Sequence, residues 1–181
     1  MNNPFSFRMR IARLAAAVVV SALARDAGAE LFVDFGFNDT NIEADIAALP
    51  ETVESDVSGI HLGVGFRREL TQGSIGARIE LDDLDGESLL AVRAFDYRRH
   101  ISERFALTAF AGAARLDLDT PAYGWYFGGG AQLKDLWPRW SLAVDLRFGD
   151  KLARDNGDPL APRPDDFYDL RGLTFYLSRG F

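Results

Sequence analysis

Hydrophobic and polar residues alternate one by one in segment 140–148 of the chain. Its apolar positions are Trp140, Leu142, Val144, Leu146 and Phe148, and the positions between them are Ser141, Ala143, Asp145 and Arg147. This two-residue period predicts a β-strand with one apolar and one polar face. The segment by itself does not say whether the apolar face meets a protein core or lipid.

Seven further segments alternate in the same way, so the chain is predicted to form eight strands. The segments cover residues 31–37, 57–67, 74–82, 88–97, 105–116, 123–133, 140–148 and 171–181. We orient the fourth segment with Leu90, Val92 and Ala94 outward, because this turns Arg93 inward. The same choice turns Phe95 and Tyr97 inward. The pattern of the fifth segment gives no orientation.

The connections between these segments alternate in length and in charge. Connections 38–56, 83–87, 117–122 and 149–170 are variable and mostly long, whereas 68–73, 98–104 and 134–139 are short. The first set carries 17 acidic and three basic side chains, and the second carries three acidic and six basic ones. Strands that run up and down would place the two sets at opposite ends, one acidic and one mildly basic.

The first 29 residues have the pattern of a secretory signal peptide. Three arginines, Arg8, Arg10 and Arg13, precede the apolar run 14–23, and Ala27-Gly28-Ala29 supplies a small-residue cleavage site. We therefore expect a signal peptide at 1–29 and one folded domain at 30–181. Cleavage would remove four arginines and Asp26, which takes the formal net charge from −7 to −10 and makes nucleic acid an unsuitable partner. The chain has no cysteine, so we expect neither disulfides nor thiol chemistry.

Two classes of fold fit this pattern: a soluble β-sandwich or lipocalin-like barrel with an apolar interior, and a transmembrane barrel with an apolar exterior. The alternating loop lengths, the strand lengths and the aromatic residues favour the transmembrane barrel. The aromatic residues would form two girdles, one at the short turns and one near the long loops. The first girdle contains Trp137, Trp140 and Phe181, and the second contains Tyr123, Trp125, Phe148 and Phe167.

In a transmembrane barrel the inward positions carry charges of both signs, which predicts a network of ion pairs in the lumen. Its expected members are Asp34, His61, Arg78, Glu80, Arg93, Tyr126, Asp145 and Arg147, with Asp145 and Arg147 as partners for groups such as Tyr126. Left unpaired, such charges would be costly. Pairing residue 67 with residue 74 would place His61 opposite Glu80, although a register slip of two residues stays open.

The chain resembles the small eight-stranded outer membrane barrels of the OmpA-like and OmpX-like kind. The features that carry the resemblance are the signal peptide, eight alternating strands joined by long and short connections, and the last strand 173–181, which ends in Phe181. Arg179 departs from the family pattern, since a hydrophobic residue is usual there; its guanidinium would extend to the interface. The resemblance implies an outer membrane location, contact with membrane lipid and lipopolysaccharide, and insertion by the outer membrane assembly machinery. We expect a monomer without a cofactor.

Some barrels of this kind are enzymes, and the lipid A deacylases use a His-x-Ser pair near the outer leaflet. Here His100-Ile101-Ser102, followed by Glu103, has that spacing but lies in a short turn at the opposite end. We therefore predict no catalytic, cofactor or metal site, and a structural or surface-interaction role. A lipid A-modifying enzyme and a soluble periplasmic binding barrel stay open as alternatives. Eight strands exclude a wide pore, and a narrow ion path stays open.

Two features of the chain suggest further local structure. In connection 38–56, residues Thr40 to Glu43 have the pattern of a helix capping box, which predicts a short helix over the barrel mouth. The carboxylates of the acidic loops allow two interpretations. They bind Ca²⁺ or Mg²⁺ ions that bridge to lipopolysaccharide phosphates, or they form a solvated acidic surface without a bound ion. The run Gly128 to Gly130 fits relief of crowding inside a narrow barrel.

Overall fold

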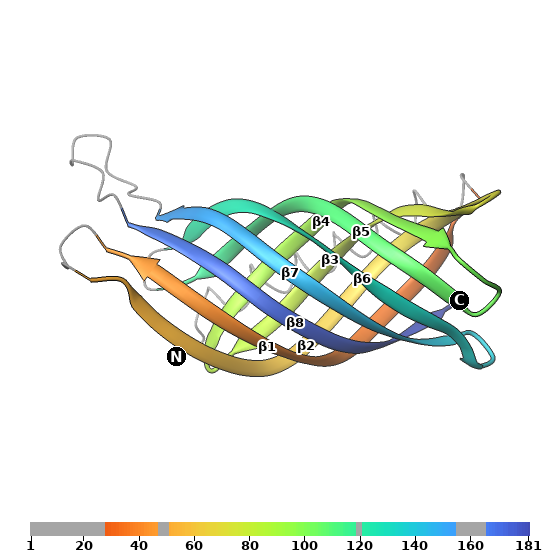
Figure 1. Cartoon of the computed structure of the whole chain (residues 1–181), viewed down its shortest axis with the longest axis horizontal. Helices are drawn as coiled ribbons and strands as arrows, with labels where there is room; N and C mark the ends of the chain where they lie inside the picture. The colour runs from red at the N-terminus through yellow and green to blue at the C-terminus, as the bar shows by residue number, and fades with distance from the viewer. Residues whose placement is uncertain (1–27, 47–50, 119–120, 155–165) are drawn as a thin grey trace, which may run out of the picture.

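The chain folds into a closed barrel of eight antiparallel strands, each paired with its sequence neighbours, with β1 also paired to β8 (Figure 1). The computed structural model describes residues 28–46, 51–118, 121–154 and 166–181. The predicted eight-stranded antiparallel barrel is thus confirmed. The strands are β1 (Glu30–Asp45), β2 (Val53–Leu70), β3 (Gly73–Leu84), β4 (Glu87–His100), β5 (Phe105–Asp117), β6 (Ala122–Trp137), β7 (Trp140–Arg154) and β8 (Phe167–Gly180). No helix among these residues is both long and apolar enough to span a membrane.

The strands extend further than the sequence pattern predicts. They contain 12 to 18 residues, and β1 pairs with β2 as far as Ala44 opposite Val53. Residues Thr40 to Glu43 therefore lie within β1, and the helix predicted there is wrong for these residues; residues 47–50 lie outside the described part. The β-ladders on both sides of β1 satisfy its backbone groups, which the capping-box pattern does not take into account.

The two ends of the barrel differ. We call the end that contains the connections after β2, β4 and β6 the short-turn end; these connections span only residues 71–72, 101–104 and 138–139. The other end, with the connections after β1, β3, β5 and β7, is the long-loop end. The C-terminus lies at the short-turn end, where the backbone N–H of Phe181 donates to the carbonyl oxygen of Leu31 (Figure 1). The predicted signal peptide lies almost wholly outside the described residues.

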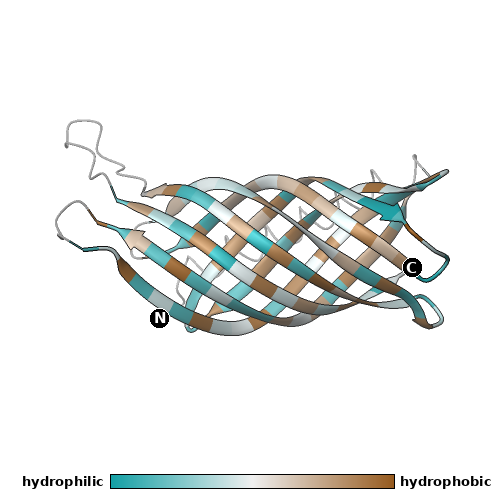
Figure 2. Ribbon diagram, viewed as in Figure 1, coloured by the Kyte–Doolittle hydropathy of each residue, from teal (hydrophilic) through white to brown (hydrophobic). Residues whose placement is uncertain are grey.

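Polar side chains point into the barrel and apolar ones point away from it. In β7, Ser141, Ala143, Asp145 and Arg147 are buried, whereas Leu142, Leu146 and Phe148 are exposed. Figure 2 shows the corresponding alternation of hydrophilic and hydrophobic residues along the ribbons. The pattern at 140–148 thus describes a strand whose apolar face is the outer one.

An extra residue in β4 explains why the fourth segment could not be oriented cleanly. Leu90, Val92 and Ala94 face outward and Arg93 faces inward, as expected, but the ladders to β3 and β5 both shift after Arg93. This β-bulge leaves Phe95 outward, with 47% of its surface exposed, and turns Asp96 inward. The inward orientation expected for Phe95 and Tyr97 is therefore wrong, because strict alternation does not hold across a bulge.

The register of β2 against β3 is shifted by two residues from the one expected. Arg67 lies opposite Gly76 rather than residue 74, and His61 lies opposite Asp82 rather than Glu80. The two strands pair down to Leu70 opposite Gly73, so the turn consists of only residues 71 and 72. This tighter hairpin brings a second carboxylate, Asp82, to His61. β5, which the pattern did not orient, turns Ala106, Thr108 and Phe110 inward.

The interior near the long-loop end is filled by an apolar interior cluster. Its largest aliphatic members are contributed by β3, β4, β5, β7 and β8, and each is at most 3% exposed: Leu84, Leu89, Leu116, Leu152 and Leu170. Polar side chains fill the part of the barrel closer to the short-turn end. The barrel therefore has a packed interior of two kinds, one apolar and one ionic.

Candidate functional site

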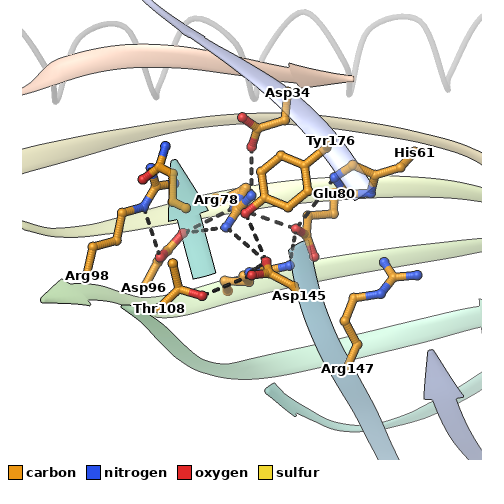
Figure 3. A network of polar contacts seen from close by, with 12 residues as sticks. Asp34, His61, Arg78, Glu80, Asp96, Arg98, Thr108, Asp145, Arg147 and Tyr176 are labelled. Carbon is orange, nitrogen blue, oxygen red and sulfur yellow. Dashed lines mark hydrogen bonds and ion pairs between the residues drawn. The ribbon is translucent and has the colours of Figure 1, made fainter. Parts of the chain in front are cut away.

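Arg78 lies at the centre of the ionic part of the interior and joins carboxylates from three strands (Figure 3). Its Nη1 donates to Asp34 Oδ2 of β1 at 2.7 Å, and its Nη2 donates to Asp96 Oδ2 of β4 at 2.8 Å. Asp145 Oδ2 of β7 lies 3.8 Å from the same Nη2. The guanidinium also faces the ring of Tyr176, 5.1 Å from its centroid. One side chain thus connects β1, β4, β7 and β8 across the barrel.

Arg93 of β4 forms the second centre. Its Nη2 lies 2.6 Å from Glu80 Oε1, and its Nη1 donates to Asp145 Oδ2 at 2.7 Å. The guanidinium lies over the ring of Phe110, 3.3 Å from the centroid, which adds a cation–π contact. Asp145 also accepts hydrogen bonds from Thr108 and from the hydroxyl of Tyr176, both at 2.9 Å. Both oxygens of this buried carboxylate thus accept hydrogen bonds, as a buried charge requires.

His61, Asp82 and Arg147 form a third group toward the apolar interior cluster. His61 Nδ1 lies 2.6 Å from Asp82 Oδ1, and Arg147 Nη1 donates to the other oxygen of the same carboxylate. His61 Nε2 lies 3.9 Å from Glu80 Oε1, which links this group to Arg93. All three side chains are at most 3% exposed. His61 is thus enclosed by carboxylates that are themselves held by arginines.

The structure brings all eight expected network residues into the barrel interior, and each is buried. The partners differ from expectation at two points. His61 has Asp82 as its hydrogen-bond partner in place of Glu80, and the hydroxyl of Tyr126 donates to Glu80 Oε2 at 3.0 Å and makes no hydrogen bond with Asp145 or Arg147. The sequence reasoning did not include six further members of this interior ionic network, namely Asp82, Asp96, Arg98, Thr108, Gln132 and Tyr176. The bulge in β4 hid Asp96 and Arg98, whereas Asp82 has the same parity as Arg78 and Glu80 and could have been found.

The interior ionic network has the properties of a structural element and lacks those of a reaction centre. Within this network, as far as the described residues show it, four buried arginines face five buried carboxylates and His61, so the charges nearly balance. The space at the boundary between the network and the apolar interior cluster is about 10 Å³, lined by Leu89, Tyr126 and Arg147 among others. That volume is at most enough for one water molecule. A substrate has no room to reach His61.

The His-x-Ser pair of the sequence does not form a catalytic pair. His100 ends β4 at the short-turn end, where its Nε2 lies 3.7 Å from Glu69 Oε2. The hydroxyl oxygen of Ser102 instead accepts the backbone N–H of Phe105 at 3.1 Å, which closes the β4–β5 turn. Ser102 is therefore a turn residue, and no hydrogen bond joins its hydroxyl to the imidazole of His100.

The aromatic residues of the expected girdles lie on the outside of the barrel near its two ends. Trp137 pairs with Trp140 across the β6–β7 turn, and Arg179 lies over the rings of Trp140 and Phe181 at 5.4 and 5.2 Å. Toward the long-loop end, Trp125 is 72% exposed, and Phe148 stacks on Phe127 with ring centroids 5.7 Å apart. Tyr123 and Phe167 are also exposed there.

The described part of the chain contains no group of three or more carboxylate or histidine side chains arranged to hold a metal ion. The acidic side chains of the long-loop end are spread over separate strand ends. Several of them are exposed: Asp39, Glu54, Asp56, Asp83, Glu87 and Asp150. Residues 155–165, which contribute further aspartates, lie outside the described part.

Comparison with known proteins relates the chain to outer membrane barrels by fold. No protein-family model matches the sequence, and no curated protein matches it significantly. Among solved structures, the attachment invasion locus protein Ail of Yersinia pestis superimposes with a TM-score of 0.53 at 10% identity, over 84% of this chain and 98% of Ail. A second Ail structure, in complex with the heparin analogue sucrose octasulfate, gives 0.53 at 11% identity, over 84% and 99%. Neisserial surface protein A gives 0.52 at 10% identity, over 85% and 99%. These likenesses show a shared fold.

Proposed function

We propose that the protein is a non-enzymatic barrel of the outer membrane with a structural or surface-interaction role. One observation carries the proposal: the polarity of the barrel is inverted relative to that of a soluble protein. Arg78, Arg93, Glu80 and Asp145 are at most 1% exposed in the interior, while Phe37, Ile60 and Leu146 are more than half exposed on the outside. In water this outer surface would be a large apolar patch around the whole molecule, which soluble monomers avoid.

The aromatic residues support a position across a membrane, in which we propose that the short turns face the periplasm. Trp137, Trp140 and Phe181 gather at one end and Trp125 and Phe148 toward the other, as in the interfacial girdles of transmembrane barrels. The basic side chains Arg68, Arg99 and Arg104 are exposed at the short-turn end, where phospholipid phosphates of the inner leaflet would lie. Lipid and lipopolysaccharide are therefore the partners that this surface fits.

The soluble binding barrel receives less support from the interior. A lipocalin-like protein needs an apolar cavity of several hundred Å³ for its ligand. The apolar part of this interior is packed by leucines, with about 10 Å³ of space beside it. An enzymatic role receives little support as well, because His100 and Ser102 do not meet and His61 is enclosed.

In the proposed orientation, the long-loop end would contact partners outside the cell. Its negative charge determines whether anionic or cationic partners can bind there. Ail was crystallised with a heparin analogue, which is a polyanion. This chain instead exposes carboxylates at the ends of β1, β2, β3 and β7. Repulsion would disfavour polyanions, and attraction between opposite charges would favour cationic partners.

The experiment is to test whether the barrel folds in a membrane. The chain without residues 1–29 is refolded into lipid vesicles and run on a gel with and without boiling. A compact barrel should migrate differently before boiling and should resist added protease. In cells, the protein should be recovered with the outer membrane. Equal migration together with recovery in the soluble periplasmic fraction would contradict the proposal.

A further inference from the structure

A polar pocket opens into the barrel at the short-turn end. It encloses about 150 Å³ and lies among the ends of β1, β2, β3, β4, β6 and β7. Its floor consists of four buried side chains from the interior: Ser74, Arg98, Gln132 and Ser141. Lys134 and Arg139 belong to its lining at the β6–β7 turn. The volume corresponds to that of several water molecules, so a small polar group fits it.

Arg98 is the residue in this floor that has an unused donor. It is 3% exposed, and its Nη1 donates to Gln132 Oε1 at 2.8 Å. Gln132 in turn donates through Nε2 to the hydroxyl of Ser141, so this chain of bonds holds the guanidinium in place. Arg98 Nη2 is buried and has no hydrogen-bond partner among the described residues. A buried charged donor without an acceptor is costly, so an acceptor supplied by a ligand would be favourable.

The carboxylates that line the pocket leave an excess of positive charge. Glu30 accepts a hydrogen bond from Arg67 at 2.8 Å, and Glu69 lies 3.7 Å from His100. Below the floor, Asp96 lies 3.8 Å from Arg98 but is held by Arg78 at 2.8 Å.

With His100 neutral, Arg98, Lys134 and Arg139 therefore remain against Glu69 and Asp135, which leaves one positive charge in excess in the lining. Lys134 and Arg139, like Asp135, make no ion pair with any residue in the described ranges. Together with the guanidinium in the floor, they line a space of about 150 Å³, in which a single oxyanion fits together with water molecules.

We propose that this pocket binds an oxyanionic group, phosphate or carboxylate, through Arg98 in its floor and Lys134 and Arg139 in its lining. Guanidinium groups match the paired oxygens of both anions, and the ammonium group of Lys134 adds a point charge. The pocket is a property of the barrel itself. That its ligand comes from the periplasm rests on the proposed membrane orientation.

The test uses the isotope-labelled barrel in an uncharged sugar detergent, because phosphocholine detergents would compete. Folding is first verified by heat-modifiable migration, so that a failure of the barrel is separated from a failure of the site. Sodium phosphate and sodium acetate are then titrated against sodium chloride at equal ionic strength. Saturable shifts of the backbone amides of Ser74, Gln132 and Ser141 with phosphate or acetate, but not with chloride, are expected.

The variants are chosen to leave the buried floor intact. A Lys134→Gln, Arg139→Gln double variant should weaken anion binding by about tenfold or more. Arg104→Gln removes the same kind of charge from the same end, outside the pocket, and should leave the affinity within about twofold. Absence of saturable shifts in wild type would overturn the proposal, because it would mean that no anion binds. Equal shifts with chloride, or equal weakening by Arg104→Gln, would overturn it as well, because either result would indicate charge screening in place of a site.

Discussion

At the scale of single residues, the two central arginines determine how the interior is held together. Arg93 contacts Glu80 and Asp145 within 2.7 Å, and its planar group rests on Phe110. Buried ion pairs of this kind contribute little net stability, but the loss of one partner is severe because it leaves the others unpaired. A single substitution in the interior ionic network should therefore lower the free energy of unfolding by far more than the net contribution of the network to stability.

Arg93→Met tests this response. Methionine keeps an unbranched side chain against Phe110 and removes the charge that holds Glu80 and Asp145. The free energy of unfolding, measured by urea titration in lipid vesicles, should fall by about 3–5 kcal/mol.

Arg99→Met is the control, because Arg99 is exposed on the same strand; its effect should stay within about 0.5 kcal/mol. If both variants unfold at the same urea concentration as wild type, the interior charges do not depend on one another.

At the scale of elements, the bulge in β4 determines which side chains of the second half of that strand face the interior. The extra residue is Ala94, since Arg93 pairs with Arg78 and Gly112, and Phe95 pairs with Ala111. Both Ala94 and Phe95 face outward, so Asp96 and Arg98 regain the inward position. Bulges commonly serve to redirect side chains in this way.

Deletion of Ala94 should therefore be tolerated. Without it, alternation from Arg93 to Arg98 becomes regular, and Asp96 and Arg98 still face inward opposite the same partners. Deletion of Val92 also removes the surplus residue, but it turns Arg93 outward and Ala94 inward. The Ala94 deletion should refold into vesicles with heat-modifiable migration, whereas the Val92 deletion should not, because it places the charge of Arg93 on the apolar face. Failure of the Ala94 deletion to refold would show that the bulge itself is required.

The same bulge limits how much of the fold the sequence pattern can predict. Alternation predicts the number of strands, the outer face of β7 and the eight buried network residues, because a period of two identifies a face directly. It does not predict that Asp96 faces inward. The extra residue exchanges the inward and outward positions that follow it, and no sequence pattern shows where such a residue lies. It also does not predict the β2–β3 register, which depends on how tightly residues 71 and 72 can turn. The pocket around Arg98 depends on both features.

At the scale of the whole molecule, the outer face should tolerate apolar side chains and reject charges. Val144 faces outward in the middle of β7, between Leu142 and Leu146. An arginine at the bilayer midplane of a transmembrane barrel costs roughly 2–4 kcal/mol. Val144→Arg should lower the free energy of unfolding, measured in lipid vesicles, by that amount, and Val144→Leu should leave it nearly unchanged. Equal folding of the arginine variant would mean that this face does not contact lipid.

The length of the strands has a consequence for how far the molecule reaches. β2 contains 18 residues, which at roughly 3.4 Å per residue and a tilt of about 40° extend roughly 45 Å along the barrel axis. The apolar band of such a barrel is only about 25 Å tall. In the proposed membrane position, the strands therefore extend beyond the apolar band into the layers of lipid headgroups, and the leucine-filled part of the interior lies toward the outer layer. The exposed carboxylates at the long-loop end would then lie among or beyond the headgroups, where a partner reaches them without entering the apolar layer.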